Sequence, residues 1–597
     1  MWRRALSHPR SSLFITLLGV LLILPSIRAG LIGDDFLFRE LITGQARHAH
    51  PGTFFGLYTF ADGQAEHTRH LKEIGIYQWW TADHARMTFW RPLSELSHWL
   101  DYQLWPDSPL LMHVHSLFWY ALLLWLFTRC LRMLDGNSMQ TSMAALLFAV
   151  SPMHLFTVIW LAARNQLIAA CFILATLMTF HLWRQGKGIA YGVASLLSMV
   201  AGLMAAEATV AVMGYLLAYV LTLESHRSPA YRRFAALLPF VIVLLGWRLI
   251  YNQLGYGSEN SGGYIDPGVD PWRFTQAMLL RLPALLLAKL FGASSTVFQL
   301  LPDQSQTFYA VGALTLIALS VWVGRSYRIW ADPLARFWGL GALLALIPVC
   351  AAAANDRLLL NAELGLSAVL AMLFRAAWVH RHPLTQVWRK RVVARPVVLA
   401  LMLVHLLVFP IAKASLAITT PSMLDLAAQV EPLSLPNQSQ APTSQVILIN
   451  PPKALFVGYY PVIRRYFGLD NAASMQALTS GDQTLHLTVL DSTHIRLRGD
   501  RGLGESVSRD FKKLPFKVGD SLAAGDFHVT VEAVTASGNA SQVVFEFNSP
   551  LTEKPWQLFA WGDHGYAPFT LPAPGQSVTL PPADVGKVIR QQLKKLF

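Results

Sequence analysis

The sequence predicts an α-helical polytopic membrane protein, with about 11 transmembrane helices and a β-rich domain at its C-terminus. Only 14% of the residues are charged, against roughly 25% in soluble proteins, and the mean hydropathy is +0.39. Apolar runs of about 20 residues, long enough to cross a hydrocarbon core, recur between residues 11 and 418. Beyond residue 418 the hydropathy falls and apolar residues alternate with polar ones, which is typical of strands.

The apolar runs interpreted as transmembrane helices have boundaries that carry an error of a few residues. They cover residues 11–29, 109–128, 142–161, 165–183, 189–206, 208–223, 234–251, 307–324, 337–354, 358–376 and 396–418. A further apolar run, 274–293, contains Arg281, Pro283 and Lys289. Counting it as a span would place the basic residues Arg325 and Arg328 outside, so we expect an interfacial or re-entrant helix on the outer face.

The excess positive charge lies in the membrane part of the chain. The whole sequence has 48 Lys and Arg against 35 Asp and Glu, whereas residues 419–597 contain 15 of each. With the N-terminus inside, the predicted cytoplasmic segments hold 19 basic and three acidic residues. Basic residues are enriched in cytoplasmic loops. The sequence therefore predicts a multi-pass protein of the cell (inner) membrane, with a cytoplasmic N-terminus and an extracytoplasmic, periplasmic C-terminal domain.

Two outer loops are longer than simple connectors. The first, about residues 30–108, is rich in Trp, His and Tyr and contains WWTADHARMTFWRPLSELSHWLDYQLW. Trp and Tyr are enriched at membrane–water boundaries, so we expect helices that lie there. The second, about residues 252–273, is rich in glycine. Both loops are assigned to a membrane domain that covers residues 1–418.

The rest of the chain predicts a linker and a soluble domain. Residues 419–445 are rich in Pro, Ser and Gln and are expected to be the linker. Within residues 446–597, alternating segments predict a small antiparallel sandwich or barrel. These segments are THIRLRG, FHVTVEAV, QVVFEFN, WQLFAW and QSVTL. The last residues, 585–597, predict a basic amphipathic helix, for which a packed or frayed terminus is favoured over a membrane-surface role.

Several kinds of site find no support in the sequence. The three cysteines, Cys130, Cys171 and Cys350, lie in apolar runs, which excludes a disulfide scaffold or a cysteine-rich metal site. No Walker loop, G-x-G-x-x-G or G-x-S-x-G motif is present. No nucleic-acid partner is expected, because the basic excess lies in short loops between apolar runs. The histidines of the first loop lack a zinc motif. No cofactor is identified, and a divalent metal is left open.

Two adjacent carboxylates, Asp34 and Asp35, follow the first predicted span on its outer side. Ionised carboxylates at a membrane boundary require a cation or hydrogen-bond donors if they are buried. One of them is a candidate general base that would activate an acceptor hydroxyl. The alternative is that both are solvated loop residues or help to set the topology.

Charged residues near the outer ends of the predicted helices form a second group of candidates. They are Arg164, Glu207, Arg281, Lys289, Asp356 and Arg357. Charges in apolar segments are expensive, so they usually pair or line a polar cavity. Because arginine makes bidentate contacts with phosphate, such a cavity would suit a phosphate-bearing lipid. Structural ion pairs that hold helices together are the alternative.

Five segments, taken in order, resemble a known family. They are GDDF at 33–36, WRPLSELSHWLDYQLW at 90–105, FAVSPMHLFTVIWLAARNQLIAA at 148–170, AAEATV at 205–210 and NDRLLLNAELGL at 355–366. In their order and spacing the chain resembles polytopic GT-C glycosyltransferases, which use lipid-linked sugar donors, over residues 11–376. The nearest pattern is that of protein O-mannosyltransferases, of the transmembrane, tetratricopeptide-repeat mannosyltransferases and of their bacterial relatives.

The resemblance implies roles for individual residues. Asp34 and Asp35 match the family's acidic pair, one of which would be the catalytic base. Arg91, Arg164 and Arg357 match basic positions suited to the donor phosphate or to the structure of the cavity.

The chain also departs from the family pattern. Glu207 matches the acidic residue of a Lys–Glu pair, but Ala206 stands where the lysine would be. The His-Pro-x-His-x-Glu run reads Ser151 to Phe156; it loses its first histidine and its glutamate, and its second histidine, His154, is a further candidate.

The resemblance implies a hexosyltransferase that works with inversion. It would move a sugar from a polyprenyl-phosphate donor to an envelope glycan, lipid or protein acceptor at the outer membrane face, in contact with membrane lipids. A non-catalytic GT-C-fold protein of envelope glycan assembly is the first alternative. A transporter is the second, and would be expected to show charges at mid-membrane and on both faces.

Overall fold

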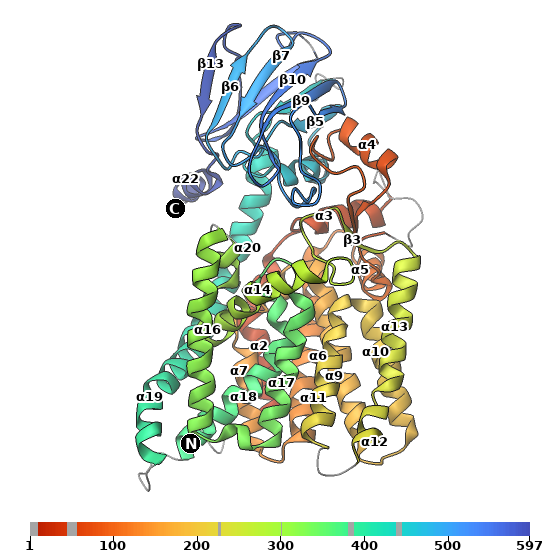
Figure 1. Cartoon of the computed structure of the whole chain (residues 1–597), viewed down its shortest axis with the longest axis vertical. Helices are drawn as coiled ribbons and strands as arrows, with labels where there is room; N and C mark the ends of the chain where they lie inside the picture. Colours follow the sequence, from red (N-terminus) through yellow and green to blue (C-terminus); the bar gives the residue numbers. More distant parts are fainter. Residues whose placement is uncertain are drawn as a thin grey trace. The chain divides into compact units, whose positions relative to one another are not determined.

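The computed structural model describes residues 10–44, 56–224, 229–299, 301, 303–379, 387–436, 444–553 and 555–596. The chain divides into two compact units, each built from segments distant in the sequence (Figure 1). The helical unit comprises Met1–Gly30, Trp90–Leu254 and Asp266–Pro421. The sheet unit comprises Leu31–Phe89, Gly255–Ile265 and Ser422–Phe597.

The helical unit consists of long apolar helices with short ones between them. They are α2 (Ser11–Ile23), α5 (Pro92–Leu104), α6 (Pro109–Leu134), α7 (Ser138–Ala149), α8 (Leu155–Ile159), α9 (Arg164–Arg184), α10 (Ile189–Ala205), α11 (Ala211–Thr222), α12 (Ala230–Ala235), α13 (Leu238–Gln253), α14 (Pro271–Phe291), α15 (Ser295–Gln299), α16 (Asp303–Ser326), α17 (Pro333–Val349), α18 (Leu360–Val379), α19 (Val387–Leu403) and the start of α20 (Phe409–Leu433). Among the described residues, eight helical stretches are long and apolar enough to cross a membrane. The predicted multi-pass helical architecture is confirmed.

Small residues let neighbouring helices approach closely. A Cβ added at Gly214 of α11 would lie 2.7 Å from the Leu344 Cβ of α17. One added at Gly341 of α17 would lie 2.3 Å from the Tyr215 ring of α11. Membrane helices associate through such close van der Waals packing, because lipid offers no hydrophobic drive toward association.

The predicted span 142–161 is wrong as a continuous helix. Helix α7 ends at Ala149, and the chain continues through Ser151 and Pro152 into the short α8 and the 3₁₀ helix η2 (Leu161–Ala163). Proline lacks the N–H that a continuing helix needs, and it disfavours helical geometry in the residue before it. The break places His154 between two helices rather than inside one.

The apolar run 274–293 lies almost entirely within α14. Its length and composition alone would allow it to cross a membrane. It contacts α16 and α17 and runs obliquely to them (Figure 1). Its interfacial placement stays a prediction.

The sheet unit begins with a small antiparallel sheet from the two long loops. Strands β1 (Thr59–Asp62) and β2 (Arg86–Thr88) come from the first loop, and β3 (Gly257–Glu259) comes from the second. The unit also contains α3 (Asp34–Ile42) and α4 (Ala65–Glu73). Much of both loops therefore groups with the C-terminal region rather than with the membrane domain expected from the sequence.

Two further sheets form the body of the sheet unit. The first is antiparallel, in the order β13 (Ser577–Leu580), β6 (Leu485–Val489), β7 (His494–Arg498), β10 (Ala540–Phe547), β9 (Phe527–Val534) and β8 (Ser521–Ala524). The second has the order β12 (Gly565–Pro568), β11 (Trp556–Gly562), β4 (Gln445–Leu448) and β5 (Ser474–Ala477). The predicted strand segments are confirmed.

The expectation of purely antiparallel sheets is wrong for the second sheet. Strand β4 pairs in parallel with both β11 and β5. Between β4 and β5 the chain forms the 3₁₀ helix η7 (Ala454–Tyr459) and α21 (Tyr460–Tyr466). Parallel neighbours require such a crossover connection, whereas antiparallel strands can be joined by a tight turn.

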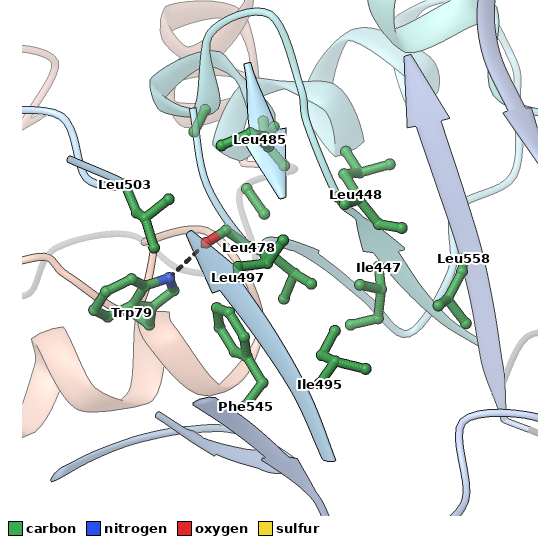
Figure 2. Close-up of a cluster of buried hydrophobic side chains, with 14 of the residues drawn as sticks. Trp79, Ile447, Leu448, Leu478, Leu485, Ile495, Leu497, Leu503, Phe545 and Leu558 are labelled. Atoms are coloured by element: carbon green, nitrogen blue, oxygen red, sulfur yellow. Dashed lines mark hydrogen bonds between the residues drawn. The ribbon is translucent and has the colours of Figure 1, made fainter. Parts of the chain in front are cut away.

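Two adjacent tryptophans of the first loop lie in the core of the sheet unit. Trp79 and Trp80 are fully buried there, together with apolar side chains of both larger sheets. The Trp79 indole N–H donates to the Leu478 carbonyl at 2.9 Å, and its ring lies beside Phe545 (Figure 2). The expected place of these tryptophans at a membrane boundary is therefore wrong.

The ends of the C-terminal region are helical. The segment expected to be a linker, 419–445, is helical as far as Leu433 of α20. At the other end, α22 (Val585–Leu596) buries Val588 in the core, with Val585 and Ile589 against it. The favoured prediction of a packed terminal helix is confirmed.

Candidate functional site

The acidic pair stands at the start of α3 in the sheet unit. Gly33, the residue before the helix, has a φ of +53°, a left-handed conformation that glycine adopts without steric cost. Asp34 and Asp35 then occupy the first turn. Negative charge is stabilised there by the partial positive charge of the helix N-terminus. The Gly-Asp-Asp sequence is thus well suited to begin this helix.

The two carboxylates have different surroundings. Asp35 is only 2% exposed, and its Oδ2 accepts a hydrogen bond from the Ile32 N–H at 3.0 Å. Asp34 is half-buried, and its Oδ1 accepts a hydrogen bond from the Tyr459 hydroxyl at 2.7 Å. The alternative of two solvated loop residues is wrong. Because a base must be reached by its substrate, Asp34 is the better candidate of the two.

In the helical unit, Arg164 is fully buried and hydrogen-bonded by protein groups. Its Nη1 lies 2.5 Å from the Asp101 Oδ2, its Nε donates to the Ser116 hydroxyl at 2.9 Å, and its Nη2 donates to the Met112 carbonyl at 2.8 Å. The His115 Nδ1 lies within hydrogen-bonding distance, 2.6 Å, of the other carboxylate oxygen, Asp101 Oδ1. All three guanidinium nitrogens are therefore engaged inside the unit. This arrangement favours the structural alternative over a phosphate contact.

Arg91 and Glu207 form a pair that the sequence did not predict. Arg91 precedes α5, and its Nε donates to the Glu207 Oε2 at 2.8 Å. Glu207 begins the 3₁₀ helix η3 (Glu207–Val210), and its Oε1 accepts from the Tyr251 hydroxyl at 3.3 Å. Both partners are partly exposed. Arg91, from a distant segment, is thus the positively charged partner of Glu207, a role that Ala206 at the family's lysine position cannot fill.

A buried polar cluster surrounds Glu363 in the first turn of α18. Its Oε1 accepts from the Lys289 ammonium at 2.7 Å and from the Ser151 hydroxyl at 2.5 Å. Its Oε2 lies 2.7 Å from the His154 Nδ1. All four side chains are completely buried. Lys289 and His154 are therefore brought together around a carboxylate that the sequence analysis did not single out.

The same cluster extends to Lys413 of α20. Its ammonium donates to the Ala149 carbonyl at 2.6 Å and to the Tyr120 hydroxyl at 2.8 Å, and it lies 3.2 Å from the His154 Nε2. Glu363 and Lys413 are each the only charged residue of a short apolar stretch, NAELGL and FPIAKASL respectively. An isolated charge in such a segment is the signal that could have identified them.

The two remaining candidate arginines meet at the connection between α17 and α18, where Arg281 of α14 contacts the backbone and Arg357 forms part of the connection. Arg281 is half-buried, and its Nη1 donates to the Cys350 and Ala351 carbonyls at 2.8 and 3.3 Å. Arg357, also half-buried, lies in the 3₁₀ helix η5 (Asp356–Leu359), and its Cζ is 4.7 Å from the centre of the Trp160 ring. Both arginines are partly exposed, whereas Arg164 and Lys289 are completely buried, so Arg281 and Arg357 are the more accessible pair.

Asp356 beside Arg357 has a structural environment. Its Oδ2 accepts from the Ser294 hydroxyl at 2.6 Å, and its Oδ1 accepts from the Ser295 N–H and hydroxyl, each at 2.7 Å. It anchors the start of α15 to the α17–α18 connection. Across the described part of the chain, no group of three His, Cys, Asp or Glu is placed to hold a metal ion.

Comparison with known proteins gives similarities in structure only. No family model matches the chain, and no curated protein matches it. The crystal structure of ArnT from Cupriavidus metallidurans bound to undecaprenyl phosphate is similar at 11% identity and a TM-score of 0.39, covering 78% of this chain and 89% of that one. The apo oligosaccharyltransferase of Archaeoglobus fulgidus is similar at 11% identity and a TM-score of 0.39, covering 80% of this chain and 66% of that one.

A second structure of the Archaeoglobus fulgidus enzyme, tethered to an acceptor peptide, is similar at 12% identity and a TM-score of 0.40. It covers 79% of this chain and 64% of that one. At such identities and TM-scores, the substrates and the roles of residues have to be argued from this chain itself.

Proposed function

We propose that the protein is a membrane glycosyltransferase that moves a sugar from a polyprenyl-phosphate donor to an envelope glycan, lipid or protein acceptor. The observation that carries the proposal is Asp34. It is a partly exposed carboxylate at a helix N-terminus, in the GDDF segment where the sequence resembles GT-C enzymes, and a tyrosine hydroxyl holds it. Its partner Asp35 is buried and supports the helix start.

The proposed reaction is a displacement with inversion. Asp34 takes the proton of the acceptor hydroxyl while the hydroxyl oxygen attacks the anomeric carbon of the sugar. The bond from that carbon to the phosphate oxygen breaks, and polyprenyl phosphate leaves with the bonding electron pair. Proton removal by a positioned base contributes about 10²–10⁴ in rate.

Arg281 and Arg357 are the proposed contacts of the donor phosphate. Arg281 of α14 contacts the α17–α18 connection, Arg357 lies in that connection, and both are half-buried. Guanidinium groups recognise phosphate through paired N–H donors and stay charged at any physiological pH. Their positive charge would stabilise the leaving phosphate as it gains negative charge.

The proposed orientation follows the charge pattern of the loops, with the N-terminus cytoplasmic and the C-terminal region outside the cell (inner) membrane. Topology reporters fused after residue 187 should then read cytoplasmic, and those fused after residue 430 extracytoplasmic. A cytoplasmic reading after residue 430 would contradict this orientation.

A non-catalytic role in envelope glycan assembly is the second candidate. It is favoured by Arg164, Lys289 and His154, which contact buried protein carboxylates and so stabilise the fold. A protein that kept the fold and lost the reaction would retain such contacts.

The deciding experiment measures transfer of a labelled sugar from a polyprenyl-phosphate donor to the endogenous acceptor in membranes, normalised to the amount of protein. Asp34→Asn should reduce transfer about 10²–10⁴-fold without lowering the protein amount much. Asp482→Asn, at an exposed carboxylate of the sheet unit, is the matched control and should be fully active. Full activity of Asp34→Asn would reject the catalytic proposal and favour the non-catalytic role.

Asp35→Ala distinguishes the two neighbouring carboxylates in the same assay. It leaves the buried Ile32 N–H without its acceptor, a loss that costs about 1–3 kcal/mol. We expect less folded protein but near-normal transfer per folded molecule. A selective loss of transfer in this variant would instead make Asp35 the base.

A further inference from the structure

The helix that begins with Asp34 is held by one segment of the C-terminal region, residues 454–466, which form η7 and α21. Arg465 of α21 makes a two-pronged ion pair with Glu40 of α3, with both N–O distances 2.7 Å. The Tyr466 ring packs edge-on against Phe36 of α3, with 5.2 Å between ring centres. Segment 454–466 therefore fixes α3 at several points along its length.

Within this segment, Tyr459 contacts the candidate base itself. Its hydroxyl donates to the Asp34 Oδ1 at 2.7 Å. Burial, with the Asp34 charge beside it, raises the pKa of Tyr459 well above its ordinary value. The phenol therefore keeps its proton and acts as the donor throughout the physiological range.

The backbone around Tyr459 is itself fixed. The Glu505 carboxylate accepts from the Ala454 and Leu455 N–H groups at 2.9 and 3.1 Å, at the start of η7. A Cβ added at Gly458 would lie 2.4 Å from the Ile76 carbonyl oxygen, so this residue packs directly on the first loop. Tyr459 is thus presented by a rigid turn and not by a mobile loop.

We propose that Tyr459 is a positioning residue for the transfer reaction, through which the C-terminal region orients the Asp34 carboxylate. This inference rests on the proposed function. A hydrogen bond donated to a carboxylate fixes its orientation and favours its ionised form, which is the form that accepts a proton. The C-terminal region then contributes to catalysis directly and does not only recognise an acceptor.

The test compares Tyr459→Phe with Tyr466→Phe in the full-length protein. Both variants remove one hydroxyl from the same short segment. Tyr466 contacts α3 through its ring, against Phe36 and Arg39, and phenylalanine retains that ring. A general effect of losing a tyrosine hydroxyl in segment 454–466 would therefore appear in both variants.

We expect Tyr459→Phe to lower kcat about tenfold, the effect of losing one hydrogen bond to a charged group. The acidic limb of its pH–rate profile should move to higher pH, because the carboxylate loses a donor that favours its ionised form. Tyr466→Phe should change neither quantity. A merely structural Tyr459 would lower the amount of protein and leave both kcat and the profile unchanged, and this result would overturn the proposal.

Asp34→Asn separates this inference from the proposed function. If Asp34→Asn is inactive while Tyr459→Phe matches the wild type in kcat and pH profile, the positioning role is wrong and the base assignment stands. If Asp34→Asn is fully active, the proposed function itself fails. In the doubly substituted protein, Tyr459→Phe should cause no further loss of transfer beyond that of Asp34→Asn.

Discussion

At the scale of single residues, burial separates arginines that the sequence treats alike. Arg164 and Arg357 both match basic positions of the family, and both lie close to apolar helices. Arg164 is completely buried against the Asp101 carboxylate, whereas Arg357 is half-buried and stacked on Trp160. The first arrangement stabilises the fold, and the second leaves the guanidinium partly exposed.

Arg164→Ala should therefore act through folding. Removing one partner of a buried ion pair typically costs about 3–5 kcal/mol, because the other charge stays buried without compensation. We expect a much lower amount of detergent-extracted protein and a lower midpoint of thermal unfolding. Arg357→Ala is the comparison, and should keep the midpoint near that of the wild type while weakening donor use. An unchanged midpoint for Arg164→Ala would show that the Asp101 contact is not structural.

The sequence identified the charged candidates of the site but not most of their partners. Asp34, Arg164 and Lys289 could be recognised from their positions in or beside apolar runs. Tyr459, Asp101 and Glu363 could not be assigned to them, because the pairs are separated by 425, 63 and 74 residues along the chain. Periodicity reports which face a residue occupies, and it carries no information on which distant segment meets that face.

At the scale of helices and strands, the patterns that depend on near neighbours were predictable. Alternation located β7, β9, β10, β11 and β13, and apolar length located most of the long helices. The break between α7 and α8 was missed, although Pro152 marks it, because the apolar run continues on both sides. The parallel pairing of β4 was missed for another reason, since a short apolar strand does not reveal the direction of its partners.

The end of α20 gives the sheet unit a pH-dependent contact. Glu431 is buried there, and its Oε2 accepts from the Tyr460 hydroxyl at 2.5 Å. Tyr460 lies 3.1 Å from the Tyr566 hydroxyl, so β12 also faces this group. Burial raises the pKa of Glu431 from 4.5 to about 7, with Glu505 adding to the rise and Lys453 opposing it.

Because the folded protein favours the protonated carboxyl, this contribution to stability is complete below pH 4.5 and is lost as the pH rises through about 7. It amounts to about 3 kcal/mol at most. The midpoint of thermal unfolding of the full chain should fall between pH 5 and 8. Glu431→Gln keeps an uncharged acceptor for Tyr460 and should show a smaller fall. Equal slopes for the two proteins would mean that Glu431 titrates normally.

At the scale of the whole molecule, the sheet unit is assembled from three parts of the chain. The first loop supplies Trp79 and Trp80 to its core and β1 and β2 to its smallest sheet. Gly75 of the same loop has a φ of +79°, and an added Cβ there would lie 2.3 Å from the Met475 carbonyl oxygen of β5. The second loop adds β3. The composition of each segment could be read from the sequence. That the three segments share one core could not.

This assembly predicts that residues 446–597 do not fold alone, although their alternating strands suggest an independent domain. The fragment would lack two completely buried indole rings, and replacing one buried tryptophan by alanine typically costs about 3–5 kcal/mol. A small domain is stable by only about 5–15 kcal/mol, so losing both rings should remove most of its stability. We therefore expect the isolated fragment to show no cooperative unfolding transition by circular dichroism. Joining residues 56–89 to it through a flexible linker should restore the transition, and the same fusion with Trp79→Ala and Trp80→Ala should not. A cooperative transition in the fragment alone would show that the strands suffice and that the tryptophans only cover a finished core.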